Sequence, residues 1–152
     1  MIEFITRKDQ KEKIAEKILQ ALPDWFGVEK YTREYIKQSS DMPFWAYKEN
    51  VDYVGFISLK KTADFTAEIY VMGILPQYHR QGIGKQLFAA FESYAKVQGY
   101  EYVQVKTVER GHYDEYDKTV SFYESLGFRA LEVFPTLWDE HNPCLVMVKS
   151  VT

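Results

Sequence analysis

The sequence predicts a mixed α/β fold in which helices flank one β-sheet. Short runs with apolar side chains at alternate positions, typical of strands, occur along the whole chain. Longer segments carry apolar residues three or four positions apart, which is typical of amphipathic helices. A turn with two glycines, at residues 79–85, joins a predicted strand to a predicted helix near the middle of the chain. The length of 152 residues suits a single domain, residues 1–152, and is too short for two ordinary domains.

The N-terminal part is predicted to form one strand and two helices. Residues 2–6 are apolar at alternate positions, as in a strand. Residues 9–22 carry apolar side chains at helical spacing with Lys and Glu elsewhere, so we expect an amphipathic helix. Pro23 ends it, because proline disfavours the helical conformation of the residue before it. Residues 29–38 are predicted to form a second helix with a narrow apolar face.

Three strands are expected next, at residues 44–48, 53–59 and 66–75. In the third of these, strict alternation divides the side chains between two faces, with Ala67, Ile69 and Val71 on one and Glu68, Tyr70 and Met72 on the other. Gly73 lies late in this strand, where an isolated glycine often marks a bulge or a close approach of another backbone.

The C-terminal half continues with a helix at residues 82–97, a strand at 102–108 and a short helix at 117–126. Strands at 128–134 and 145–149 complete the sheet. The predicted order is therefore one strand, two helices, three strands, a helix, a strand, a helix and two strands. Such an order, with a strand–turn–helix unit in its middle, is typical of a mixed sheet.

The composition is that of a globular protein and argues against several kinds of partner. The formal net charge is −3 and the isoelectric point is near 5.7, whereas binding to nucleic acid depends on Lys and Arg that neutralise phosphates. The single cysteine, Cys144, cannot form an intramolecular disulfide, which is consistent with a reducing cytoplasm. We find no signal-peptide pattern and no apolar run long enough to span a membrane. We therefore expect a cytoplasmic protein without nucleic-acid or membrane partners.

The turn at residues 79–85, His-Arg-Gln-Gly-Ile-Gly-Lys, has the features of an anion-binding site. A helix that begins after such a turn points backbone N–H groups without partners at whatever lies in front of it, and its dipole adds positive charge there. Gly82 and Gly84 allow a diphosphate to approach the backbone, because no Cβ stands in the way. Arg80 and Lys85 add charge at the rim.

Two well-known nucleotide-binding motifs do not fit this spacing. A Walker-type loop requires a glycine where His79 stands and a Ser or Thr after the lysine, where the chain has Gln86. A dinucleotide-binding motif requires a third glycine where Leu87 stands. The turn therefore belongs to another class of phosphate-binding site.

Residues 67–84 resemble motif A of the GNAT superfamily of acyl-CoA N-acyltransferases, and residues 122–128, Phe-Tyr-Glu-Ser-Leu-Gly-Phe, resemble its motif B. The order of elements also matches this family over essentially the whole chain. The resemblance implies a mixed, mostly antiparallel twisted sheet of about seven strands with four helices. It implies an acetyl-CoA-dependent N-acetyltransferase whose cofactor-binding residues are Ile74, Leu75, His79, Arg80, Gln81, Gly82, Ile83, Gly84, Lys85 and Phe122.

The chain departs from the family pattern at two positions. His79 stands where the family has Gln or Arg, a mild departure because backbone amides do most of the pyrophosphate binding. Tyr116 stands seven residues ahead of Tyr123, where many members carry an Asn that contacts the cofactor. The contact of that Asn is therefore not expected here.

The resemblance also implies roles in catalysis. Tyr123 is expected to stabilise or protonate the thiolate of coenzyme A as it leaves. A backbone amide at Ile74 or a neighbour is expected to polarise the acetyl carbonyl, exposed by a bulge for which Gly73 is suited. Glu68, placed by alternation on the side of the open cleft, is the best candidate for a base, against the alternative of a solvated glutamate facing outward.

The acceptor side is less defined. By resemblance, the loop after the first helix and a loop between the last two strands, residues 138–142, form the walls of the acceptor site. We expect contacts to a primary amine from Trp25, Phe26, Tyr70 and Trp138. His112 and His141 are not spaced as metal ligands, so no metal is expected. A non-catalytic acyl-CoA sensor or an interaction module remains an alternative, and a homodimer would be in keeping with the superfamily.

Overall fold

The computed structural model describes all residues from Met1 to Thr152. In chain order its elements are β1 (Ile2–Ile5), α1 (Lys8–Gln20), α2 (Glu29–Ser39), β2 (Phe44–Glu49), β3 (Asp52–Ala63), β4 (Thr66–Ile74), a short 3-10 helix (Pro76–Tyr78), α3 (Ile83–Val97), β5 (Tyr102–Val108), α4 (Asp114–Ser125), β6 (Arg129–Asp139) and β7 (Asn142–Ser150).

The strands form one seven-stranded sheet in the order β1-β2-β3-β4-β5-β7-β6. Only β4 and β5 pair in parallel, and every other neighbouring pair is antiparallel. The predicted fold class and element order are thus confirmed. The last two strands are longer than expected and meet in a tight hairpin, in which Asp139 pairs with Asn142. The expected loop at residues 138–142 is therefore shorter than predicted, because only residues 140–141 lie between the two strands.

Helices cover both faces of the sheet. A Cβ at Gly73 would lie 3.0 Å from a methyl of Ile18, so this side of β4 packs directly against α1. The next residue, Ile74, points to the opposite face, where a Cβ at Gly55 would touch both Ile74 and Leu87 of α3 at 3.2 Å. Hence α1 and α3 lie on opposite faces, and the apolar core fills the space on both sides of the central strands.

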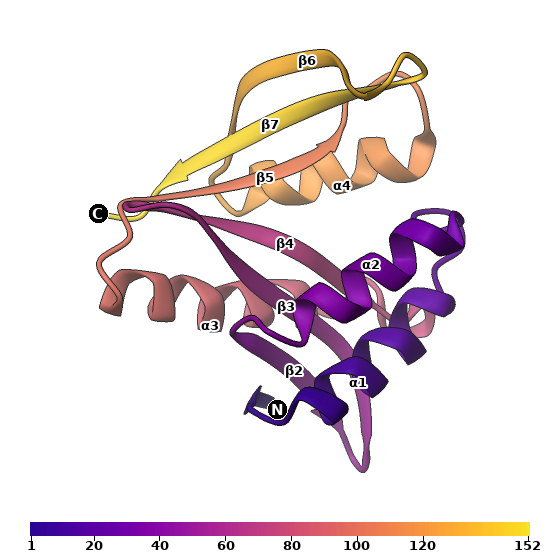
Figure 1. Ribbon diagram of the computed structural model, residues 1–152, viewed down its shortest axis with the longest axis vertical. Coiled ribbons are helices and arrows are strands. Elements are labelled where there is room, and N and C mark those ends of the chain that lie inside the picture. The colour runs from indigo at the N-terminus through magenta and orange to yellow at the C-terminus, as the bar shows by residue number, and fades with distance from the viewer.

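The sheet opens between its two middle strands. Pairing between β4 and β5 is limited to Thr66 with Tyr102, Ala67 with Val103 and Glu68 with Gln104. Beyond this short segment the two strands diverge, with β5, β6, β7 and α4 on one side of the opening and the rest of the molecule on the other (Figure 1). The opening is the feature of the fold that positions the candidate site.

A β-bulge interrupts β4 near this opening. Ser58 of β3 pairs with Val71 and the next residue, Leu59, pairs with Ile69, so Tyr70 is the extra residue. The bulge therefore lies at Tyr70 and not at Gly73, where the sequence suggested it. It also breaks the expected alternation, because Tyr70 turns toward α2 while Met72 turns to the face of α3. Gly73 is instead required by the close approach of α1.

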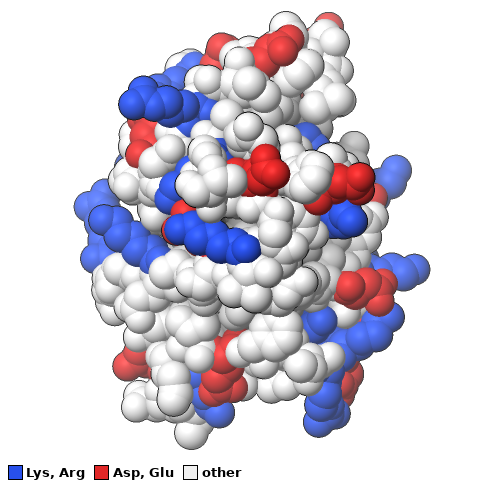
Figure 2. Space-filling view, turned by 90° about the vertical axis from the view of Figure 1, so that its left-hand side faces the viewer, with Lys and Arg blue, Asp and Glu red and all other residues white.

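The surface carries charges of both signs. On the face shown in Figure 2, Lys and Arg side chains alternate with Asp and Glu, and no field of a single sign covers it. No helix combines the length and hydrophobicity that a membrane-spanning segment requires.

Candidate active site

A cleft of about 1120 Å³ occupies the opening between β4 and β5. Its walls come from the loop between α1 and α2, from α2, from β4, from the N-terminus of α3, from β5 and α4, and from the end of β6. It brings together most of the predicted site residues, which are Trp25, Phe26, Tyr70, Ile74, His79, Arg80, Gly82, Ile83, Gly84, Lys85, Phe122, Tyr123 and Trp138. Glu68, Leu75 and Gln81 do not line it.

The N-terminus of α3 has the geometry of an anion-binding site. Gly82 has φ of 79° and precedes the helix, whose first amides have no carbonyl partner within it and no side-chain cap. A Cβ at Gly82 would meet nothing within 4 Å, so the space in front of this glycine is open. The turn therefore fits a pyrophosphate held by backbone amides.

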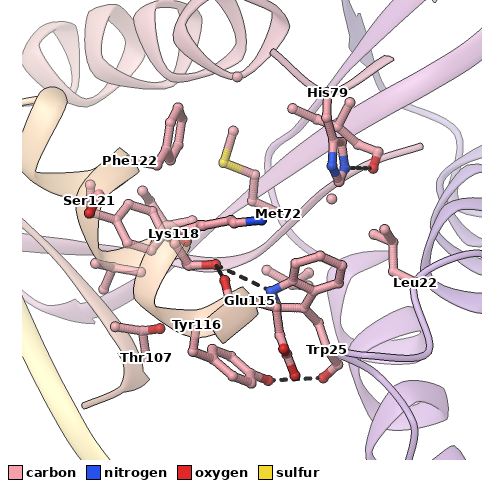
Figure 3. Close-up of a pocket in the computed structure, with 18 of the residues that line it drawn as sticks. Leu22, Trp25, Met72, His79, Thr107, Glu115, Tyr116, Lys118, Ser121 and Phe122 are labelled. Atoms are coloured by element: carbon pink, nitrogen blue, oxygen red, sulfur yellow. Dashed lines mark hydrogen bonds between the residues drawn. The ribbon is translucent and has the colours of Figure 1, made fainter. Parts of the chain in front are cut away.

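Cations without carboxylate partners surround this turn. Arg80, itself with a positive φ of 63°, and Lys85 both line the cleft and form no ion pair. Lys118 of α4, which the sequence did not indicate, lines the same cleft without a partner (Figure 3). These side chains are free to pair with phosphate groups.

Gly84 has a different role from Gly82. A Cβ at Gly84 would lie 2.7 Å from Cζ of Phe122, which is closer than such a contact allows. The missing side chain thus lets α3 pack against α4, and Phe122 lies in the cleft wall next to the turn. This contact connects the two sequence motifs in space.

His79 is directed toward β4, and its Nε2 donates to the Ile74 carbonyl oxygen at 2.7 Å. Leu75, the residue after β4, donates its backbone N–H to the Val54 carbonyl oxygen at 2.8 Å. Because the direction of backbone groups alternates along a strand, the amides of Met72 and Ile74 point away from β3 and toward the opening. These are the amides available to a carbonyl bound in the cleft.

Tyr123 lies in the wall of the cleft and is 8% exposed. Its hydroxyl has no hydrogen-bond partner in the protein, and burial raises its pKa above the usual tyrosine range. The phenol therefore remains protonated at neutral pH. It can donate a proton to a group that enters the cleft.

Glu68 is buried beneath the cleft and does not face it, contrary to expectation. Its Oε1 lies 3.1 Å from Nζ of Lys106 and accepts a hydrogen bond from Gln104 at 3.1 Å. The reason is local, since Glu68 is the last residue at which β4 and β5 still pair. The alternative of a solvated glutamate facing outward is also wrong, because the carboxylate is buried and paired with Lys106.

Trp25 connects the loop between α1 and α2 to α4. Its indole N–H donates to Oγ1 of Thr119 at 3.2 Å, and its carbonyl accepts from the Tyr116 hydroxyl at 3.1 Å (Figure 3). Burial raises the pKa of Tyr116 to about 12, so this bond persists at neutral pH. The role of Tyr116 in bridging the cleft was not evident from the sequence.

Several further cleft residues escaped the sequence analysis. Tyr35 of α2 and Thr107 of β5 line the cleft, and Thr107 Oγ1 is a buried hydroxyl without any hydrogen-bond partner. No sequence signal distinguished Thr107 from other strand residues. Tyr35 is one of the few large apolar side chains of α2, together with Tyr31 and Ile36. No group of His, Cys, Asp and Glu side chains has the arrangement of a metal site.

Comparisons with known proteins agree with this geometry. A model of the acetyltransferase (GNAT) family matches residues 11–128. The N-alpha-acetyltransferase RimI of Mycobacterium tuberculosis is 30% identical over 79 residues, which are 52% of this chain and 45% of that protein. The chain thus aligns with less than half the length of this curated relative.

Solved structures share the fold over the full chain. A protein of Desulfovibrio desulfuricans assigned to the GNAT family superposes with a TM-score of 0.85 at 16% identity, covering 100% of this chain and 99% of the other. A GNAT family acetyltransferase of Elizabethkingia anophelis, solved with acetyl-CoA bound, has a TM-score of 0.74 at 18% identity and covers 99% and 97%. At identities this low, the superpositions establish a shared fold and nothing beyond it.

Proposed function

Since the chain belongs to the GNAT acetyltransferase family, we propose that it transfers an acetyl group from acetyl-CoA to a primary amine, directly and within a ternary complex. The observation that carries this proposal is the α3 N-terminus, where free amides, an open approach at Gly82 and unpaired cations meet in one cleft. A relative of the same fold binds acetyl-CoA.

The donor is held by side chains and backbone from both sides of the opening. We place its pyrophosphate on the amides that follow Gly82, with Arg80, Lys85 and Lys118 neutralising phosphate charge. The acyl end then extends between β4 and β5, past Phe122 and toward the free amides of Met72 and Ile74. An amide there stabilises negative charge on the carbonyl oxygen as the amine attacks.

The leaving thiolate needs a proton, and Tyr123 is the buried, protonated donor in the cleft. The attacking amine must be neutral, whereas a lysine-like amine has a pKa of about 10.4. We assign its deprotonation to solvent rather than to Glu68, because the Glu68 carboxylate is already paired with Lys106. Positioning of the two substrates in line supplies the remaining rate enhancement.

Binding and turnover test the proposal together. Isothermal titration of the purified protein with acetyl-CoA should give saturable binding, and thiol release in the presence of amines should report transfer. A Gly82→Val variant should lose donor binding, because a β-branched side chain is strained at positive φ and fills the space of the pyrophosphate. A Gly99→Val variant, also at positive φ but at the far end of α3, controls for strain alone.

The outcomes separate the competing interpretations. Absence of acetyl-CoA binding by the wild-type protein would rule out an enzyme and a sensor alike. Binding without thiol release from any amine would leave the non-catalytic sensor. Normal donor binding by Gly82→Val would refute the assignment of the pyrophosphate site.

A further inference from the structure

One end of the cleft has a wall of aromatic rings. Phe26 of the loop between α1 and α2, Tyr35 of α2 and Tyr70 of β4 all line the cleft. Phe26 contacts Tyr35 edge-to-face with centroids 5.8 Å apart, and Tyr35 contacts Tyr70 in the same way at 5.3 Å. The bulge at Tyr70 is what turns this ring toward α2. The three rings form one continuous surface for a flat apolar group.

Charges of both signs lie around this wall. Burial raises the pKa of both Tyr35 and Tyr70, and the nearby carboxylates of Glu68 and Glu34 add to this rise. Glu68 is already paired with Lys106 at 3.1 Å. The ammonium of Lys60 lies 5.6 Å from the centroid of the Tyr70 ring and occupies a cation–π position. The Glu34 carboxylate also lies near Tyr35 and Tyr70 and forms no ion pair, so this wall faces a free carboxylate as well as Lys60.

Free carboxylates lie elsewhere in the cleft. Asp24, just before Trp25, and Glu115, just before Tyr116, line the cleft and form no ion pair or side-chain hydrogen bond in the protein. They can attract one ammonium group to the cleft before it loses its proton.

Two hydroxyl groups of the cleft also lack a partner. Thr107 is only 4% exposed, and its Oγ1 is fully buried and makes no hydrogen bond. Tyr35 is only half-buried and its hydroxyl has no partner in the protein, whereas the Tyr70 hydroxyl donates to Gln38 at 3.0 Å. A buried polar group without a partner costs about 1–3 kcal/mol, so the Thr107 hydroxyl destabilises the empty cleft.

We propose that the acceptor is a small amine with a flat apolar body, which packs on Phe26, Tyr35 and Tyr70. The inference rests on the proposed acetyl transfer and specifies its acceptor. It excludes polyamines and aminoglycosides, because neither class has a flat apolar group to pack on the three rings.

An acceptor panel tests this inference. With saturating acetyl-CoA, thiol release is measured for 2-phenylethylamine, spermidine, kanamycin and a short peptide with a free alanine N-terminus. We expect kcat/KM for 2-phenylethylamine to exceed that of each other amine by at least tenfold. Equal or higher values for spermidine, kanamycin or the peptide would overturn the inference while leaving acetyl transfer intact. If no amine reacts although acetyl-CoA binds, the proposed function fails and the inference fails with it.

A matched pair of variants on α2 locates the subsite. Tyr35→Leu should lower kcat/KM for 2-phenylethylamine by about tenfold, mainly through KM, because it removes the central ring of the wall. Tyr31→Leu, one turn earlier, changes an exposed tyrosine outside the cleft and should leave kcat/KM unchanged. Thermal melts and acetyl-CoA titrations of both variants identify a folding or donor-binding defect. Equal kcat/KM for the two variants would place the acceptor elsewhere.

Discussion

The Tyr123 hydroxyl combines burial, protonation and the lack of a protein partner at the point where the cleft needs a proton donor. Tyr123→Phe should therefore lower kcat by about 10²–10⁴-fold, the range of general acid catalysis, with little change in the dissociation constant for acetyl-CoA. Thiol release gives the rate and isothermal titration gives the affinity. Tyr94→Phe, which removes a hydroxyl from the side of α3 that packs on Trp45, is the control. An unchanged kcat would remove Tyr123 from the mechanism.

Thr107 offers a second test on a single atom. Because its buried hydroxyl has no partner, Thr107→Val should raise the free energy of unfolding of the substrate-free protein by about 1 kcal/mol. Urea denaturation checks this, with Thr136→Val on the exposed strand β6 as a control expected to have no effect. A loss of stability of similar size would mean that the hydroxyl makes a hydrogen bond in the folded protein.

At the level of elements, the sequence predicted the helices and strands well because their hydrophobic periods are clear. The helix at residues 82–97 is α3, which begins one residue later after its glycine cap. The helix at 117–126 starts earlier, at Asp114, because its first turn is acidic and polar and carries no apolar period. Likewise β6 is exposed along most of its length, so alternation could not mark its end at Asp139.

The bulge at Tyr70 shows why part of the site escaped prediction. Strict alternation assigned Glu68, Tyr70 and Met72 to one face, but one extra residue in β4 moves Met72 to the other. A bulge is set by the register with β3, which is a property of two strands and not of one segment. The motifs predicted the donor site from local spacing, whereas the acceptor wall brings together Phe26, Tyr35 and Tyr70 from three elements.

At the level of the whole molecule, the cleft divides the sheet into two parts that share little backbone pairing. Three residue pairs join β4 to β5, and the hydrogen bonds of Trp25 with Thr119 and Tyr116 join the parts again on the far side of the cleft. A donor bound between them would contact α3 on one part and α4 on the other. Its binding energy is therefore coupled to the stability of the complete fold.

The coupling predicts a thermal shift. At a concentration of acetyl-CoA one hundred times its dissociation constant, binding to the folded state alone adds about 2.7 kcal/mol of stability. For a protein of this length, each kcal/mol raises Tm by about 2–4 °C, so we expect a rise of roughly 5–10 °C. Differential scanning fluorimetry measures the shift, and Gly82→Val should show none at the same concentration.

A ligand held by only one part of the sheet would still stabilise the native state. Contact of the donor with both parts is therefore tested by comparing the shifts given by acetyl-CoA, 3′-dephospho-CoA and pantetheine. A truncated ligand that lacks the pyrophosphate contacts α3 least and should give the smallest shift, whereas equal shifts for all three would contradict the placement of the donor across the opening.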